Sequence, residues 1–158
     1  MMYPWQAFAI QSKFSHKIAL RTAQGDIFNW AQLAERVNQT VSFLQNKGVN
    51  PESAVAFVGK NTENILFLYL ATIQLGAKIL GINPAFPQEK IIELCNVHHI
   101  DFCFYDEDLR DFPKADVVIQ KADFFRPATM TLTSGSTGLP KAVVHNVQAH
   151  LDNAKGVC

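Results

Sequence analysis

A loop rich in glycine and hydroxyl groups, from Thr133 to Lys141, is the segment of this sequence best suited to chemistry. An apolar run leads directly into it, and its first six residues are all small. With so little side-chain bulk, backbone N–H groups can converge on an anion, and the hydroxyls add short donors to phosphate oxygens. Lys141 adds a positive charge, and Pro140 stiffens the exit. The predicted phosphate-binding residues are Thr133, Ser134, Gly135, Ser136, Thr137, Gly138 and Lys141.

This loop differs from two common phosphate-binding patterns. A Walker A loop reads G-x-x-x-x-G-K-S/T, whereas here Lys141 follows Gly138 by three residues and the two glycines are three apart. The dinucleotide fingerprint also fails, because a third glycine is missing. The alternative is an ordinary surface loop, since clusters of Gly, Ser and Thr are common between elements. The apolar strand before the loop and the Pro-Lys and apolar run after it favour phosphate binding.

The composition is that of a soluble globular domain. The chain has 158 residues, of which 48% are hydrophobic and 18% charged, so it can bury one core and is not expected to be disordered. The formal net charge is zero, whereas general binding to nucleic acids or anionic membranes needs a positive field, so neither is expected as a partner. An anion site in this chain must therefore be local and built from backbone dipoles.

The cysteines and the apolar stretches predict a cytoplasmic protein without a membrane span. The cysteine count is odd and the spacing fits no zinc template, so buried free thiols in a reducing cytosol are expected. The amino terminus lacks the features of a secretory signal. The apolar stretch 65–82 contains Gln74, Lys78 and two glycines, which favours a buried helix and strand. The cysteines are Cys95, Cys103 and Cys158.

Hydrophobic periodicity predicts the helices and strands that would hold the loop. We expect a short helix over 5–14 and a hairpin of 18–21 with 26–29, turned by Gly25. Asn29 can cap the next helix, and Gly48 and Gly76 can end helices. The order of strand and helix after residue 30 predicts an α/β fold of one domain, with a parallel sheet and helices on both faces. Further helices are expected at 30–47, 62–75, 87–98 and from 146, and strands at 53–59, 77–82, 101–105, 117–120, 128–133 and 142–144.

Other polar and aromatic residues have both a structural and a functional interpretation. His98 and His99 end the fourth predicted helix, which favours a role at the helix dipole over a metal site. The acidic run of Asp106, Glu107, Asp108 and Asp111 favours a solvated loop over a magnesium patch.

His145 and His150 follow the loop; His145 lines the nucleotide site or packs as an ordinary histidine. Trp5 and Trp30 are predicted to be core anchors.

The run TLTSGSTGLPKAVVH, residues 131–145, resembles the ATP-phosphate loop of the adenylate-forming superfamily of acyl-CoA synthetases, luciferases and peptide-synthetase adenylation domains. Upstream segments resemble that family in the same order: the hairpin with residues 30–33, the strand at 54–58, and the segment 75–84 with its Asn83-Pro84. The resemblance covers nearly the whole chain. It implies a three-layer, parallel-sheet subdomain, in which residues 1–158 form the amino-terminal portion of the AMP-binding domain without the small carboxyl-terminal domain.

Ala142 stands where most members of the superfamily have glycine, and this departure resembles the branch of o-succinylbenzoate–CoA ligases of menaquinone biosynthesis. The resemblance implies two steps: ATP and a carboxylate give an acyl-adenylate and pyrophosphate, and the CoA thiol then displaces AMP. ATP, an aromatic carboxylate and CoA would be the substrates, with Mg²⁺ as cofactor. Residues 133–138 would wrap the β- and γ-phosphates, and Lys141 would assist. The alternatives are a synthetase for another carboxylate and a non-catalytic fragment that binds nucleotide or phosphate.

The resemblance also implies that much of the active site lies beyond residue 158. In the family, the adenine and magnesium motif, the ribose-binding aspartate, the hinge and the lysine of the small domain all follow at later positions. We therefore expect no catalytic residue and no metal ligand within this chain. It is expected to be a fragment or truncated gene product that does not catalyse the reaction alone, or an inert fragment that needs the missing part to fold. The full-length protein could form a homo-oligomer or remain a monomer.

Overall fold

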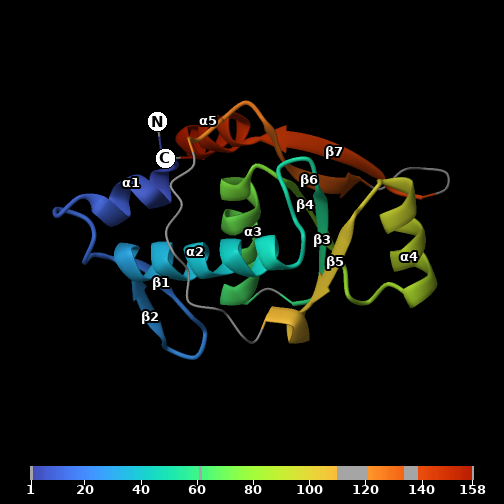
Figure 1. The fold of residues 1–158 in the computed structure, drawn as a ribbon, viewed down its shortest axis with the longest axis horizontal. Coiled ribbons are helices and arrows are strands. Elements are labelled where there is room, and N and C mark those ends of the chain that lie inside the picture. Colours follow the sequence, from blue (N-terminus) through green and yellow to red (C-terminus); the bar gives the residue numbers. More distant parts are fainter. Residues whose placement is uncertain (1, 61, 110–120, 134–138, 158) are drawn as a thin grey trace.

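The computed structural model describes residues 2–60, 62–109, 121–133 and 139–157, and a five-stranded sheet forms its centre (Figure 1). The first four strands along the sheet are parallel, and the last is antiparallel to its neighbour. The prediction of an α/β fold with a parallel sheet is confirmed, and the strand that returns from the loop adds an antiparallel edge. In spatial order the strands are β5 (Phe102–Tyr105), β3 (Ala54–Val58), β4 (Lys78–Ile82), β6 (Pro127–Thr133) and β7 (Lys141–Asn146).

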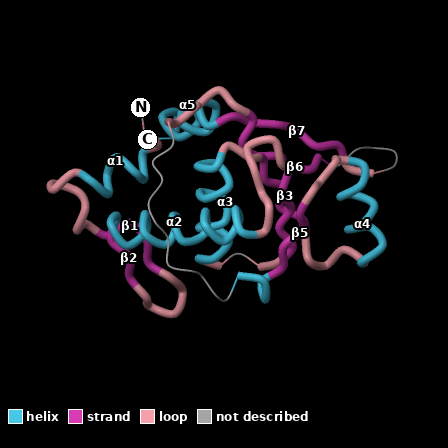
Figure 2. Tube along the Cα trace, in the orientation of Figure 1, coloured by secondary structure: helices cyan, strands magenta, loops and turns pink. Residues whose placement is uncertain are grey.

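Helices cover both faces of this sheet, which gives three layers (Figures 1 and 2). On one face lie α1 (Pro4–Ile10), α2 (Trp30–Asn46), α3 (Glu63–Leu75) and α5 (Val147–Val157), and α4 (Gln88–Val97) lies on the other. Neighbouring side chains of a strand point to opposite faces. Ile79 of β4 accordingly packs with Phe67 in the first core cluster, and Leu80 packs with Leu94 in the second. The sheet therefore separates two cores.

The amino-terminal hairpin and the helix after it form as predicted. Strands β1 (Ile18–Arg21) and β2 (Ile27–Asn29) pair antiparallel, and Gly25 in the turn has a φ of +91°. The Asn29 side chain accepts a hydrogen bond of 2.8 Å from the Gln32 N–H, and the Gln32 side chain accepts one of 2.9 Å from the Asn29 N–H. This reciprocal capping box fixes the start of α2.

Several predicted boundaries differ from the structure. The first helix ends at Ile10, whereas the sequence predicted it to continue to Phe14. Pro87 is the N-cap of α4, one position before the first-turn position predicted for it. The polar segment after β5 begins as a short 3-10 helix, Asp106–Leu109. The predicted strand 117–120 lies outside the described residues. A shift of one residue, as at Pro87, is ordinary at a helix end, whereas the first helix is four residues shorter than predicted.

The apolar stretch 65–82 folds as most of α3 followed by β4, as predicted. Within the described ranges, no helix is both long enough and apolar enough to cross a membrane.

Trp5 is buried in the first core, as predicted, and Trp30 is half-buried and packs against that core. The Trp5 ring stacks on Tyr3 at a centroid distance of 4.8 Å, and its Nε1–H donates to Gln74 Oε1 at 3.1 Å. The Gln74 Nε2 in turn donates to Asn38 Oδ1 at 2.8 Å, which joins α1, α3 and α2 through one polar chain. Trp30 lies 4.9 Å from an aromatic ring of α1. Satisfying these polar groups lets the aromatic rings remain buried at low cost.

Cys95 of α4 and Cys103 of β5 are free thiols that lie beside the second core. Both are half-buried, whereas the sequence predicted buried thiols, and Cys158 lies outside the described residues. Burial, with a smaller contribution from the neighbouring Cys103, raises the pKa of the Cys95 thiol to about 11. Because the thiolate is the reactive form, Cys95 should be an inert thiol at neutral pH.

Alkylation should therefore be slow at Cys95. At pH 8 a thiol with a pKa of about 11 is roughly 0.1% thiolate, against roughly a quarter for an ordinary thiol, so iodoacetamide should react more slowly by a factor on the order of two hundred. Peptide mass spectrometry after timed alkylation would measure this rate. A cysteine placed at exposed Ser12, as Ser12→Cys, provides the control in the same chain. Equal alkylation rates at the two sites would contradict the prediction.

Candidate functional site

The candidate site lies beyond the carboxyl ends of three neighbouring parallel strands. Gly59 and Lys60 follow β3, Asn83 and Pro84 follow β4, and Thr133 ends β6. In open sheets of parallel strands, ligands bind outside these carboxyl ends, where the loops diverge. The predicted phosphate-binding loop begins at this same edge, since it follows β6 directly.

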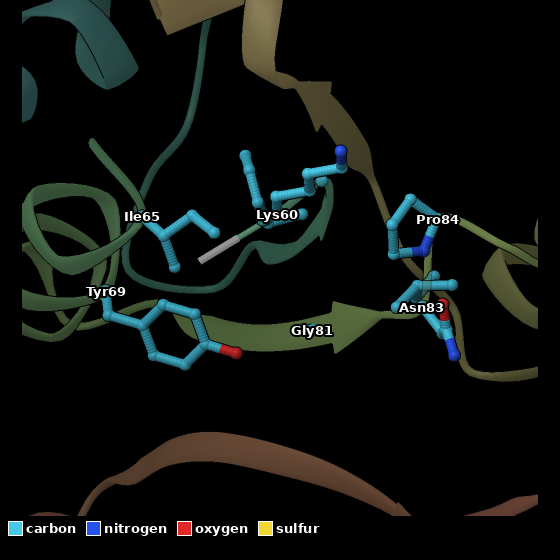
Figure 3. Close-up of a pocket in the computed structure, with 9 residues that line it drawn as sticks. Lys60, Ile65, Tyr69, Gly81, Asn83 and Pro84 are labelled. Carbon is cyan, nitrogen blue, oxygen red and sulfur yellow. The ribbon is translucent and has the colours of Figure 1, made fainter. Parts of the chain in front are cut away.

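A cavity of about 570 Å³ opens at the ends of β3 and β4 (Figure 3). Its lining combines apolar side chains with a few polar groups, which is typical of a small-molecule site. In Figure 3, the Tyr69 ring of α3 lies along Gly81 of β4, and the Lys60 side chain extends toward Pro84. A second cavity of about 260 Å³ shares Tyr69, Gly81 and Asn83 with the first and is otherwise lined by Phe86 and by Met130, Thr131 and Leu132 of β6.

Two residues shape this cavity together. A Cβ atom on Gly81 would lie 2.6 Å from the Tyr69 hydroxyl oxygen, so only glycine leaves room for the hydroxyl at that place. Burial raises the pKa of Tyr69 above its ordinary value, and its hydroxyl, protonated at neutral pH in either case, can donate a hydrogen bond. The Asn83 side chain is partly engaged, because its Oδ1 accepts a hydrogen bond of 2.9 Å from the Ala85 N–H. The cavity therefore presents a phenol, an amide N–H₂ and the Lys60 ammonium to a ligand.

Replacement of Gly81 by alanine should displace the Tyr69 hydroxyl. We expect Gly81→Ala to lower the free energy of unfolding by about 1 kcal/mol, because the added methyl group forces the far end of the Tyr69 side chain to move. Urea unfolding followed by circular dichroism would measure the loss. A double-mutant cycle with Tyr69→Phe provides the control: without the hydroxyl, Gly81→Ala should cost about half as much or less. An unchanged cost in that background would show that the hydroxyl does not occupy this space.

The two described ends of the predicted phosphate-binding loop lie side by side. Thr133 and Lys141 are the last pair of the antiparallel β6–β7 ladder, and the Thr133 Oγ1 donates to the Lys141 carbonyl at 3.2 Å. Both residues are exposed. The pairing closes the loop at its base and places the backbone of Lys141 at the carboxyl end of β6. The other predicted residues, Ser134, Gly135, Ser136, Thr137 and Gly138, lie outside the described residues.

His98 has a partner that the sequence did not predict. It is the C-cap residue of α4, and its Nε2 lies 3.0 Å from the carbonyl oxygen of Pro140, at the exit of the loop. The helix-dipole role for His98 and His99 remains a prediction. Because 42 residues separate His98 from Pro140, no local sequence pattern could have indicated this contact.

The other polar candidates lie among ordinary structural contacts. The His150 Nε2 is 2.7 Å from the Thr129 Oγ1, and the rings of His150 and His145 are 5.7 Å apart. The Asp108 carboxylate accepts a 2.8 Å hydrogen bond from the Tyr105 N–H, and Asp111 lies outside the described residues. In the part of the chain that the structure describes, no three His, Cys, Asp or Glu residues come together as a metal-binding group.

Comparison with known proteins identifies the enzyme family to which the chain belongs. The family model of the AMP-binding enzymes matches residues 7–124, so the chain belongs to the AMP-binding enzyme family. The chain is 78% identical over 157 residues to the 2-succinylbenzoate–CoA ligase of Haemophilus influenzae, covering 99% of this chain and 35% of that relative. It is 37% identical to the 2-succinylbenzoate–CoA ligase of Escherichia coli, covering 98% of this chain and 36% of that one. The chain thus spans about a third of the length of these curated relatives.

Solved structures give the same fold. A variant of E. coli MenE with bound OSB-AMS matches with a TM-score of 0.82 at 34% identity, over 99% of this chain and 37% of that one. MenE of Bacillus subtilis in complex with the acyl-adenylate intermediate OSB-AMP matches with a TM-score of 0.84 at 19% identity, over 98% of this chain and 45% of that one. The second likeness concerns the fold alone. Both agree with the three layers described above.

Proposed function

We propose that this chain is the amino-terminal part of an AMP-forming acid–CoA ligase that activates o-succinylbenzoate. ATP and the carboxylate would form the acyl-adenylate, and the CoA thiol would displace AMP, as a cytoplasmic step of menaquinone biosynthesis. The observation that carries the proposal is the loop at the carboxyl end of β6, closed at its base by Thr133 and Lys141. Its sequence and the 78% identity of the chain to the matching third of a 2-succinylbenzoate–CoA ligase support the choice of substrate.

The proposed role of the loop is electrostatic. Forming the acyl-adenylate needs positioning and stabilisation of phosphate charge more than covalent help from the protein. Backbone N–H groups and hydroxyls of residues 133–138 would bind the β- and γ-phosphates, and the Lys141 ammonium would offset their charge. Magnesium would accompany the nucleotide. We propose that its ligands are the phosphate oxygens and residues outside this sequence.

We assign residues 1–158 to the amino-terminal portion of the AMP-binding domain, which their share of the relative's length supports. The remaining recognition of adenine, ribose and acyl group would then come from polypeptide outside this sequence. The chain alone is accordingly expected not to complete the reaction. Calorimetry with Mg-ATP would test whether it binds nucleotide by itself, and no heat at millimolar ligand would remove the alternative of a nucleotide-binding fragment.

Pyrophosphate release tests the proposed activity. The polypeptide encoded by the whole open reading frame that contains these residues would be incubated with ATP, CoA and o-succinylbenzoate. Release that requires o-succinylbenzoate is expected, and product analysis should give the acyl-CoA thioester. Benzoate and a medium-chain fatty acid serve as competing substrates. Turnover with the fatty acid but not with o-succinylbenzoate would contradict the proposal and favour a synthetase for another carboxylate.

A further inference from the structure

The carboxyl end of α4 lies beside the start of β7 (Figure 1), and one side chain joins them. His98 is half-buried, and its Nε2 is 3.0 Å from the Pro140 carbonyl oxygen. A carbonyl oxygen can only accept, so the imidazole donates from Nε2. The contact therefore fixes the ring's tautomer or leaves both nitrogens protonated, and in either state it holds Pro140.

The backbone at His98 is itself fixed by the way α4 ends. The Ile100 N–H donates to the Cys95 carbonyl at 2.8 Å, and the His99 N–H donates to the Asn96 carbonyl at 3.3 Å. His99 takes the left-handed conformation, with a φ of +54°. These are the two bonds of a Schellman motif, with histidine at the position that glycine usually occupies. The imidazole of His98 thus projects from a rigid helix end.

Pro140 is the residue through which this helix end can act on the loop. Proline has no N–H, so its carbonyl is its one backbone polar group, and it directly precedes Lys141. Leu139 and Ala142, on either side, pack against the second core together with Cys95. The exit of the loop is therefore held from two sides, by the Thr133–Lys141 pair of the ladder and by His98 of α4.

We propose that His98 is a positioning residue for the phosphates of ATP: by holding Pro140 it sets the place of the Lys141 amine and of the chain leaving the loop. The inference rests on the proposed function, since it assigns His98 to the same phosphate site. His98 touches no phosphate in this account. Its effect should therefore appear in the binding of ATP and be absent from the binding of the carboxylate and of CoA.

Three variants of the whole protein test this role. His98→Leu keeps the bulk and removes the donor, His98→Gln keeps a donor near the place of Nε2, and His99→Asn is the matched neighbour, since asparagine tolerates the left-handed conformation. We expect His98→Leu to raise the KM and the calorimetric Kd for Mg-ATP about fivefold, the effect of one net hydrogen bond. His98→Gln should restore most of the loss, and His99→Asn should match the wild type.

Two measurements distinguish a failure of the positioning role of His98 from a failure of the proposed substrate. Amide hydrogen exchange at Lys141 and Ala142 should be faster in His98→Leu than in His99→Asn, whatever the substrate is. Equal exchange, or a KM that rises equally for ATP, carboxylate and CoA, would overturn the positioning role. Mg-ATP could bind more weakly to His98→Leu than to the wild type while the wild type releases no pyrophosphate with o-succinylbenzoate. That result would support the positioning role and rule out the proposed substrate.

Discussion

Replacing Lys141 by alanine is expected to lower kcat/KM for ATP about a hundredfold in the whole protein. Lys141 is exposed at the base of the loop, and its backbone, which the substitution leaves in place, pairs with Thr133. A charge-assisted contact to a phosphate is worth about 1.5–3 kcal/mol, which corresponds to roughly a tenfold to hundredfold change in rate. Steady-state kinetics with ATP as the varied substrate would measure the effect, and the melting temperature should stay near that of the wild type.

Two further variants control for charge and position. Lys141→Arg keeps the positive charge and should recover part of the activity, although its planar fork cannot reproduce the point charge of an ammonium. Lys155→Ala removes an exposed lysine from the last turn of α5, which follows the opposite end of β7 from Lys141, and should leave kcat/KM within about twofold. If Lys141→Ala retained activity comparable to Lys155→Ala, the proposed role of Lys141 would be wrong.

The second large effect is expected for Phe67→Ala in the centre of α3. The Phe67 side chain is fully buried, packs edge-to-face on Phe28 at 5.4 Å, and lies beneath the Arg36 guanidinium at 5.6 Å. Its ring therefore joins the hairpin, α2 and α3. Truncation leaves a cavity that these three elements cannot close, so the free energy of unfolding should fall by about 4 kcal/mol. Urea unfolding monitored by circular dichroism would measure this loss.

Phe125→Ala is the matched control, because Phe125 is 73% exposed and loses little contact on truncation. It should change the free energy of unfolding by less than about 0.5 kcal/mol. Because a natural domain is stable by only about 5–15 kcal/mol, the Phe67 variant should also be unfolded in a measurable fraction at moderate temperature. A loss below about 1 kcal/mol at Phe67 would contradict the prediction and would mean that the surrounding elements repack around the shorter side chain.

Local chemistry explains why so much of the fold could be predicted. The turn at Gly25, the cap at Asn29 and the end of α3 at Gly76 each depend on a few neighbouring residues, and each formed as the sequence predicted. The loop from Thr133 to Lys141 stays a predicted phosphate-binding loop, proposed because converging backbone N–H groups require a run of small residues. The alternation of strands and helices was sufficient to predict the parallel sheet and its two covered faces.

The sequence by itself thus determined the elements, the class of fold and the candidate loop. The tertiary structure decided how those elements are arranged and which residues meet. It set the order of strands in the sheet, the packing of the Tyr69 hydroxyl over Gly81, and the hydrogen bond between His98 and the Pro140 carbonyl. The physical reason is distance along the chain. A cap or a turn is an interaction between near neighbours, whereas the contact between His98 and Pro140 depends on how α4 packs against a sheet whose last strand begins 43 residues later.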